Sequence, residues 1–338
     1  MQGFETSVAP KEFAFTGNET RSLQAGRVGG GAMKCLRIQS TSTGVTHITK
    51  FALGTTLTTG TIGWAMERVV SSGSGTPTIF RLYEGSIIHV MVVYNSDGTL
   101  SVTNGPGTVV YCTSIDNMVI SDWNYLELNF TISDTVGAVD LHLNGVSVCS
   151  ATGLDTKNGG TGFVDNGAFV FSSNGGNPTF QYDDIYAVDG APLGDSVVDL
   201  LLPAGAGAST GWTPSTAVAN WTTVDDFSST DYVGTPGGSG QKDLYTTTHV
   251  ASGLTGTVVY ATQAEALLMK SDVGTPPGPV KSALRSQGGT QTTDDLATSA
   301  VLTTTAVQYT GPVKNLDPNG DAWTLARLDA MQIGVSVP

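Results

Sequence analysis

The segment Trp123-Asn-Tyr-Leu-Glu-Leu-Asn-Phe-Thr-Ile132 is followed by Val139-Asp-Leu-His-Leu143, Asn144-Gly145 and Val146-Ser-Val-Cys149. Apolar and polar side chains alternate along these segments, which is the pattern of antiparallel strands with one face on a core. Asn-Gly favours a two-residue turn, because both positions of that turn need positive φ angles. The region therefore predicts antiparallel strands in which the last two segments form a hairpin.

The same pattern extends to both sides. Residues 86–94 and 99–103 are β-rich and are separated by Asn95-Ser-Asp-Gly98, a second hairpin signal. Further strands are predicted at residues 33–39, 61–70, 78–82, 168–172 and 182–188. Many short strands with turn signals between them indicate an all-β sandwich or barrel.

The length and composition predict two domains. The chain has 338 residues, only 13% of them charged, with 43 glycines and 14 prolines, and a typical domain has about 150 residues. The first β series ends at Gly190-Ala-Pro-Leu-Gly194, and residues 203–211 are small and nearly featureless. We place the boundary near Ser196, which gives domains 1–195 and 196–338, each expected to be a jelly-roll-like β-sandwich.

The second half is also predicted to be strand-rich, at residues 241–249, 256–270, 280–285 and 300–309. Residues 263–270 could form a helix by propensity, but their β-rich neighbours favour a strand. A short helix is expected at residues 322–331, with Asp321 as its N-cap.

Net charge, hydropathy and cysteine spacing argue against several kinds of partner and site. The net charge is −14 and Lys and Arg are scattered, so nucleic acid and membrane surfaces are poor partners. Apolar stretches are too short to cross a bilayer, and the N-terminus lacks the pattern of a secretory signal. Cys35, Cys112 and Cys149 form no CxxC, so we expect three small buried hydrophobic residues and neither a disulfide framework nor zinc.

From about Phe4 to Ala191 the chain resembles the laminin-G/concanavalin-like jelly-roll family. The motifs that carry this resemblance are Gly63-Trp-Ala-Met-Glu67, Thr78-Ile-Phe-Arg-Leu82, Asn95-Ser-Asp-Gly-Thr-Leu100, Asp122-Trp-Asn-Tyr-Leu-Glu-Leu128, Leu143-Asn-Gly-Val146 and Tyr182-Asp-Asp-Ile-Tyr186. The resemblance implies a sandwich of two antiparallel sheets. Trp64 and Trp123 lie within strand patterns and are expected in the core.

Residues 196–338 are similar to segments of tailed-bacteriophage virion proteins that carry such a jelly roll in front. The matching motifs are Trp212-Thr-Pro-Ser215, Asn220-Trp-Thr-Thr-Val-Asp225, Asp231-Tyr-Val233, Gly240-Gln-Lys-Asp-Leu-Tyr245 and Trp323-Thr with Gln332-Ile-Gly-Val335. This resemblance implies a virion location, other virion proteins as partners and a homo-oligomer.

No catalytic constellation is found, so we expect no enzymatic activity. A sandwich hydrolase would need two converging carboxylates. Glu127 is instead expected on a solvated strand face, and the adjacent Asp183 and Asp184 should point to opposite faces of a strand. The histidines His47, His89, His142 and His249 share no metal-ligand spacing and are assigned to strand faces.

Calcium is the one metal for which weak candidates exist. Asp317-Pro-Asn-Gly-Asp321 offers oxygen ligands at Asp317, Asn319 and Asp321, but it lacks the later glutamate of an EF-hand loop. A turn leading into the last helix is the favoured interpretation. Asp183 with Asp184, and residues 155–160, are comparable weak candidates, and no other cofactor is expected.

Aromatic side chains are the candidates for sugar contacts or interfaces. Trp212, Trp221 and Tyr232 lie in loop-rich sequence, and Tyr83 and Tyr111 are additional candidates.

Three functions follow from these observations. The first is a non-enzymatic structural component of a tailed-phage virion, tail-associated or fibre-like and in contact with the host surface; a capsid decoration or collar protein is the alternative position on the particle. The second is a glycan-binding adhesin, with a host surface glycan as partner. The third, a polysaccharide hydrolase, requires a cleft with two carboxyl groups.

Overall fold

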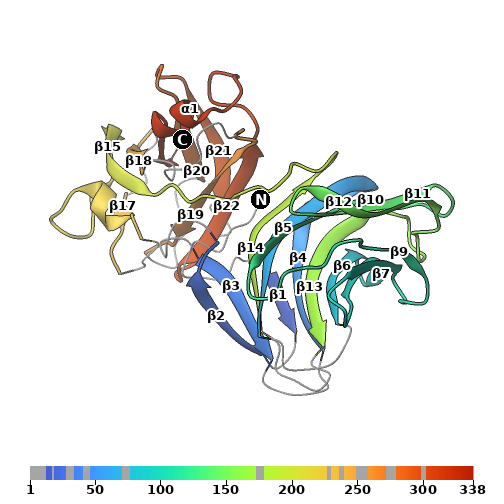
Figure 1. Ribbon diagram of the computed structural model, residues 1–338. Helices are drawn as coiled ribbons and strands as arrows, with labels where there is room; N and C mark the ends of the chain where they lie inside the picture. Colours follow the sequence, from blue (N-terminus) through green and yellow to red (C-terminus); the bar gives the residue numbers. More distant parts are fainter. Residues whose placement is uncertain are drawn as a thin grey trace. The chain divides into compact units, whose positions relative to one another are not determined.

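The computed structural model describes residues 13–16, 19–27, 34–40, 46–70, 77–172, 179–226, 230–235, 240–248, 258–271, 279–297 and 302–337. Contacts divide the chain into two compact units, Met1–Val198 and Asp199–Pro338. Within the described residues, regular structure is almost entirely antiparallel strand, so the all-β prediction is confirmed (Figure 1). No described helix is both long and apolar enough to cross a bilayer.

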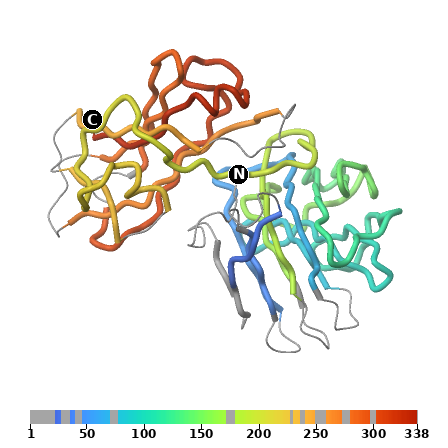
Figure 2. Tube along the Cα trace, turned by 60° about the vertical axis from the view of Figure 1, so that its left-hand side comes forward, coloured from blue at the N-terminus to red at the C-terminus, as the bar shows by residue number. Residues whose placement is uncertain are grey.

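Two seven-stranded antiparallel sheets form the first unit. The first sheet has the order β1 (Phe13–Thr16), β4 (Thr46–Leu57), β13 (Val164–Ser172), β6 (Thr78–Glu84), β7 (Ile87–Tyr94), β8 (Leu100–Asn104) and β9 (Val110–Thr113). The second sheet has the order β12 (Val146–Leu154), β11 (Gly137–Leu143), β10 (Trp123–Thr131), β5 (Thr59–Val70), β14 (Thr179–Val188), β3 (Lys34–Ser40) and β2 (Glu19–Ala25). Figure 2 shows β3 and β14, which are distant in sequence, running side by side.

Aromatic rings from both sheets meet in the core between them. Trp64 of β5 stacks on Phe80 of β6 with ring centroids 4.2 Å apart, and Tyr182 of β14 stacks on Phe169 of β13 at 4.1 Å. All four side chains are fully buried, as predicted for Trp64. Each stacked pair takes one ring from each sheet, so the two sheets form a sandwich with one shared core.

Trp123 differs from the prediction, because it is half-buried on the outer face of the second sheet. The inward positions of β10 are Leu126, Leu128 and Phe130, which belong to the core. Strand alternation therefore turns Trp123 and Tyr125 outward.

The predicted Asn144-Gly145 hairpin is confirmed. Asn144 and Gly145 have φ angles of 51° and 81°, and they connect β11 to β12. The Asn144 side chain accepts a hydrogen bond from the Tyr125 amide, which ties the turn to β10. The turn thereby fixes the register of three neighbouring strands.

The second unit is built on a five-stranded antiparallel sheet. Its order is β15 (Pro203–Thr210), β18 (Lys242–Thr247), β23 (Gln332–Ser336), β20 (Val280–Arg285) and β21 (Gln291–Ala297). Two-stranded ribbons join β16 (Thr213–Pro214) with β17 (Val233–Gly234), and β19 (Thr262–Leu268) with β22 (Val307–Lys314). The β19–β22 ribbon packs on the large sheet through Leu268, Val280 and Tyr309.

Local predictions in the second unit have mixed outcomes. Residues 262–268 form the favoured strand, and a helix does occur within residues 322–331. That helix, α1 (Leu325–Asp329), is capped by Thr324, whose hydroxyl accepts from the Arg327 amide, and Asp321 is not the cap. A 3₁₀ turn, η1 (Asn220–Thr223), was not predicted.

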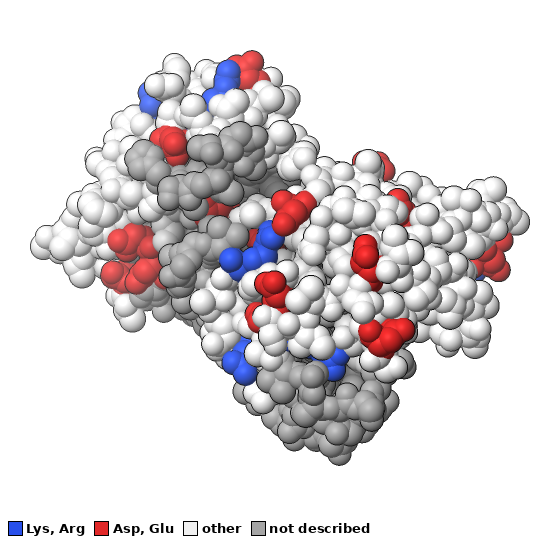
Figure 3. Space-filling model, viewed as in Figure 1, with Lys and Arg blue, Asp and Glu red and all other residues white. Residues whose placement is uncertain are grey.

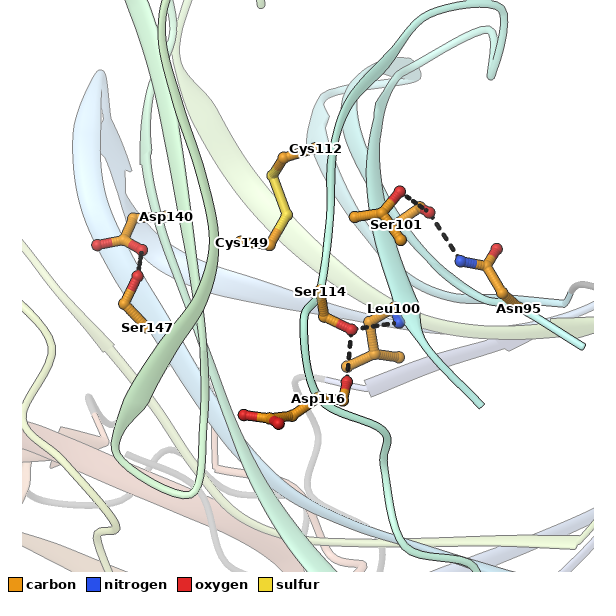
Figure 4. Close-up of a disulfide and its surroundings, with 10 residues drawn as sticks. Asn95, Leu100, Ser101, Cys112, Ser114, Asp116, Asp140, Ser147 and Cys149 are labelled. Atoms are coloured by element: carbon orange, nitrogen blue, oxygen red, sulfur yellow. Dashed lines mark hydrogen bonds between the residues drawn. A yellow bond between two sulfur atoms is a disulfide. The ribbon is translucent and has the colours of Figure 1, made fainter. Parts of the chain in front are cut away.

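The expectation of three reduced cysteines is wrong for two of them. Cys112 of β9 and Cys149 of β12 form a disulfide (Figure 4). Cys35 is free and buried. β9 and β12 are edge strands of different sheets, so the bond joins the two layers. Their separation of 37 residues gives no local signal, and only the sandwich topology brings the two sulfurs together.

We predict that the double substitution Cys112→Ser with Cys149→Ser lowers the free energy of unfolding by roughly 3–4 kcal/mol, because a crosslink across a loop of this length restricts the unfolded chain. Urea denaturation of the oxidised proteins measures the change. Cys35→Ser is the matched control, and reductant should destabilise it as much as it destabilises the parent. Equal stability of the parent with and without reductant would contradict the prediction.

Candidate functional site

The outer face of the first sheet carries two cationic side chains in one row of the strand register. The strand register aligns Lys50 of β4, Ala168 of β13, Arg81 of β6 and Met91 of β7 in one row across the sheet. Phe51 and Leu82, their neighbours in sequence, point inward into the core. Lys50 and Arg81 must therefore point away from the core, although 31 positions separate them in the sequence.

Tyr83 lies between these two cations. The Lys50 ammonium lies 4.6 Å from the centroid of the Tyr83 ring, and Arg81 Nη1 donates to the Tyr83 hydroxyl at 3.4 Å. Lys50 Nζ also donates to the carbonyl of Gly85. Tyr83 is buried under these groups, so its ring is a support for the cations rather than an exposed stacking surface.

The Arg81 guanidinium is only partly engaged within the protein. Its Nε is buried and makes no hydrogen bond to any described residue, and the Tyr83 hydroxyl is the acceptor found for Nη1. Asn166 of β13 is paired with Tyr83 in the next row of the same face. Its side-chain Nδ2 donates to Asp165 at 2.5 Å. The face thus combines two cations with amide and hydroxyl groups.

Glu84, at the end of β6, anchors the loop next to this face. Its carboxylate accepts from the Thr161 amide at 2.8 Å, from the Thr161 hydroxyl at 2.8 Å and from the Gly162 amide at 2.9 Å. The hydrogen bond from the Thr161 amide, aided by the other donors, lowers the pKa of Glu84 to about 2. A side chain at Gly160 would collide with this carboxylate.

The outer face of the second sheet is covered by the segment that follows β14. The Leu193 amide donates to the Tyr186 hydroxyl at 2.9 Å, and the Gly194 amide donates to Glu127 Oε1 at 2.8 Å. The Tyr186 hydroxyl itself donates to Glu127. Glu127 is therefore fully buried, which corrects the expectation of a solvated residue. The alternation in β10 does place Glu127 on the outer face of the sheet, but the segment that covers it cannot be inferred from alternation.

Asp183 and Asp184 also differ from the prediction, because both carboxylates bind the same arginine. The Arg27 amide donates to Asp183 at 3.0 Å, and Arg27 Nε donates to Asp184 at 2.8 Å. A bulge interrupts β14 between Asp183 and Tyr186, and Asp184 has a φ of 51°. This bulge breaks the alternation that would have separated the two side chains.

Arg27 also holds the end of the first unit. Its Nη1 donates to Asp195 at 2.5 Å and its Nη2 to the Ser196 carbonyl at 2.7 Å. Asp184 accepts from the Val198 amide at 2.8 Å. Burial raises the pKa of Asp183, and the Asp184 carboxylate raises it further; burial likewise raises the pKa of Asp184, against the opposing effect of Arg27.

The aspartates that were candidate calcium ligands form ion pairs with arginines. Arg27 lies against Asp183 and Asp184, and Arg327 pairs with Asp317 and with Asp321. No group of three or more His, Cys, Asp or Glu side chains among the described residues is arranged to hold a metal.

The loop of Asp317 forms the favoured turn. Asp317 Oδ1 accepts from the amides of Asn319 and Asp321, both at 2.9 Å. Although partial burial opposes it, these bonds and Arg327 lower the pKa of Asp317. A pocket of about 200 Å³ beside the turn is lined by Ser286, Trp323 and Arg327 among others. In the other weak candidate, residues 155–160, Lys157 pairs with Asp134 at 3.1 Å.

The three predicted aromatic residues of the second unit come close together. β16 follows Trp212, β17 follows Tyr232, and these strands pair. The Asn220 side chain donates to the Trp212 carbonyl at 2.8 Å and to buried Asp243 at 2.5 Å. Asn220 precedes Trp221 in η1, so Trp221 is held near Trp212. Both tryptophans are half-buried and Trp212 packs in the core, whereas Tyr232 is exposed. Their role in binding stays a prediction.

The histidines have structural environments where they are described. His47 and His89 are buried, and His89 lies 3.2 Å from the Glu84 carboxylate. His142 lies 3.0 Å from Asp140 on an outer sheet face. His249 is outside the described residues.

Comparisons with known proteins give likeness of structure only. No protein-family model and no curated protein sequence matches the chain. Among solved structures, a cellulose-induced protein, Cip1, is similar with a TM-score of 0.40 and 12% identity over 53% of this chain and 92% of that one.

Two further structures have a similar degree of likeness. Lectin II from Ulex europaeus has a TM-score of 0.39 and 11% identity over 55% of this chain and 97% of that one. A conserved carbohydrate esterase from the Shiga toxin-encoding bacteriophage phi24B has a TM-score of 0.36 and 12% identity over 53% and 91%. At these TM-scores the likenesses identify no ligand and no activity for this chain, and the resemblance to phage virion proteins stays a prediction.

Sequence reasoning missed Lys50, Arg81 and Arg27. The strands of Lys50 and Arg81 are not neighbours in the sheet, since β13 lies between them. The sequence does carry one signal, which is the scarcity of Lys and Arg in this unit. None occurs between Arg81 and Lys157. On the face visible in Figure 3, carboxylates are scattered and Lys and Arg are few.

We predict that Glu84→Gln releases the loop of residues 158–162, because a neutral amide cannot replace a carboxylate that accepts several hydrogen bonds. Hydrogen exchange of the Thr161 and Gly162 amides measures the loss of protection. The folded-state pKa of Glu84 is lowered, so its stabilising contribution is present above its ordinary pKa of 4.5 and is lost as the pH falls towards about 2. Asp134→Asn, at an exposed ion pair, is the control; protection unchanged in Glu84→Gln would refute this role.

We predict that Arg27→Ala lowers the free energy of unfolding by about 3–5 kcal/mol at pH 8, because it leaves two buried carboxylates without their cation. Since the folded-state pKa values of both aspartates are raised, their contribution to stability is present at low pH and is lost as the pH rises through those values. The defect of the variant should therefore shrink towards pH 5 in urea denaturation. Arg37→Ala is the control, and a defect of equal size at both pH values would count against the assignment.

Proposed function

We propose that the first unit binds a saccharide on the outer face of the first sheet, and that the chain is a non-enzymatic glycan-binding adhesin. The observation that carries this proposal is the row that places Lys50 and Arg81 on the same outward sheet face, with only Ala168 of β13 between them. Sugar hydroxyls and carboxylates are the acceptors that such donors bind.

The two cations of this face favour a saccharide that carries carboxylate groups. The net charge is −14, so two cations in one row of a sheet face are unusual for this protein. The nearby carboxylates do not compete for them, because Glu84 accepts from Thr161 and Gly162, and Asp165 accepts from the Gly85 amide at 3.0 Å. A uronic or sialic acid unit offers the planar carboxylate that a guanidinium binds with two hydrogen bonds.

The same structure supports a role without catalysis. The buried acids of the first unit are engaged in structural contacts: Asp183 and Asp184 with Arg27, and Glu127 with Tyr186 and Gly194. A hydrolase of this architecture would instead present two carboxyl groups to a substrate cleft.

We further propose that the adhesin is a component of a tailed-phage virion, tail-associated or fibre-like, and that it contacts the host surface. The motifs of residues 212–245 and 323–335 support this location, and so does the disulfide, since such bonds persist on virion and cell surfaces. A capsid decoration or collar position is the alternative, and the position of density for this chain in images of the intact particle would distinguish the two.

We predict that the full chain binds acidic saccharides on a glycan array, and that Arg81→Ala weakens the affinity for the best saccharide by about 10- to 100-fold, as expected for a lost charge-assisted hydrogen bond. Lys50→Ala should have a similar but smaller effect. Titration calorimetry measures both variants.

Lys157→Ala is the matched control, because it removes a cation of the same unit that pairs with Asp134. Its affinity should equal that of the parent. Failure of the parent to bind any saccharide, or an unchanged affinity of Arg81→Ala, would exclude this face as the site.

A further inference from the structure

A pocket of about 200 Å³ lies between two turns of the second unit. One turn connects β20 to β21, and the other leads into α1. Among the residues that line the pocket, Ser286, Asp317 and Trp323 are buried, whereas Gln287 and Asn319 are exposed. The pocket therefore reaches from the surface into the unit, and we call it the turn pocket.

Hydrogen bonds hold both turns of the turn pocket in place. In the first turn, the Gly289 amide donates to the Ser286 carbonyl at 3.0 Å, and in the second, the Gly320 amide donates to the Asp317 carbonyl at 2.9 Å. The Ser286 hydroxyl donates to Asn319 Oδ1 at 3.1 Å and so ties one turn to the other. Because these groups are already ordered, a ligand would lose little free energy in ordering them.

The charged groups at the turn pocket are engaged with one another. The Arg327 guanidinium pairs with Asp317 through one nitrogen and with Asp321 through another. Asp317 Oδ1 also accepts from two backbone amides, and its Oδ2 lies 3.4 Å from Asn319 Nδ2. The Asp317 carboxylate thus has its acceptor positions used, and the guanidinium has both of its ends paired. These contacts disfavour a cation or an anion as the ligand and favour an uncharged molecule.

Neutral polar groups of the turn pocket remain available for a ligand. Among the described residues, no hydrogen-bond partner is found for the Gln287 side chain or for the backbone amides of Gln287 and Gly288. The Gln287 side chain offers an acceptor oxygen and a donor nitrogen, and the Ser286 hydroxyl can still accept after it has donated to Asn319. Donors and acceptors without charge therefore lie together at this pocket.

The buried residues Pro318 and Trp323 add apolar surface to the lining. Trp323 packs with Leu284 of β20 and Leu328 of α1 in a small core. Its indole Nε1 donates to the Lys314 carbonyl at 2.9 Å, so the ring is fixed in orientation. The turn pocket thus combines neutral polar groups with a rigid apolar wall.

We propose that the turn pocket binds one unit of an uncharged saccharide. A sugar ring carries hydroxyls, which both donate and accept, and C–H groups that pack on apolar surface. The volume of about 200 Å³ is below the roughly 300–1,000 Å³ of pockets for drug-sized ligands, so the pocket encloses one ring and not a longer chain. This site lies in the second unit and is independent of the acidic saccharide proposed for the face of Lys50 and Arg81.

The test is nuclear magnetic resonance of the isotope-labelled full chain, titrated with the neutral methyl glycosides of glucose, galactose, mannose and N-acetylglucosamine. We expect at least one glycoside to shift the amide signals of Gln287, Gly288 and Asn319 and the indole N–H signal of Trp323. The shifts should saturate together, and their dependence on glycoside concentration gives the dissociation constant.

Two variants and two controls locate the binding. Gln287→Ala should weaken the affinity by about 3- to 10-fold, as expected for a lost hydrogen bond. Gly288→Phe should abolish binding by filling the pocket, and it can fold because a Cβ at Gly288 would have only Ser286 Oγ nearby, at 3.9 Å. Thr290→Ala, at an exposed position of the same turn outside the lining, is the matched control and should bind like the parent. Arg81→Ala should also keep the affinity for the neutral glycoside, which separates this site from the acidic one.

Three results would overturn the proposal. The first is a parent in which no glycoside shifts the signals of the turn pocket. The second is an unchanged affinity of Gln287→Ala, or of Gly288→Phe once circular dichroism has confirmed its fold. The third is a shift of the same signals by calcium chloride or by glucuronic acid but by none of the neutral glycosides, because a charged ligand would show that the charges of the pocket are not satisfied internally.

Discussion

The first unit depends on stacking of aromatic rings across the space between its two sheets. Trp64 and Tyr182 come from one sheet and Phe80 and Phe169 from the other, and the centroid distances of 4.2 and 4.1 Å place each pair in direct contact. Large buried rings supply much apolar contact for few residues. In a chain with only 13% charged residues and many glycines, these contacts fix the two layers at one spacing and so determine which side chains face outward.

The outer faces of the two sheets then serve different purposes. The second sheet is covered by residues 189–198, which bury Glu127 and Tyr186 and bring Asp184 to Arg27. The fit is close, because a side chain at Gly63 would overlap the ring of Tyr186. The first sheet keeps Lys50 and Arg81 on its outer face. The first sheet therefore presents cationic side chains on its outer face, while the polar groups of the other layer hold the chain as it leaves the unit.

The strands, the hairpins and the buried Trp64 were predictable because their signals are local. Alternation needs only a few residues, and Asn144-Gly145 specifies its turn directly. The site was much less predictable. Glu127 is buried by a segment more than 60 residues away, the bulge at Asp184 breaks the strand period, and the row of Lys50 and Arg81 requires β13 to be inserted between β4 and β6. Each of these features arises from strand order, which neither alternation nor turn propensity specifies.

The disulfide between β9 and β12 has a mechanical consequence. Antiparallel sheets that only pack on each other can be peeled apart from an edge, one strand at a time, when a pulling force acts on the chain. Cys112 and Cys149 lie on the edge strands of opposite layers, so on this side the layers are covalently joined. Force applied to either edge strand must there be shared by both sheets, and rupture would have to begin at the opposite side, where β1 and β2 form the edges.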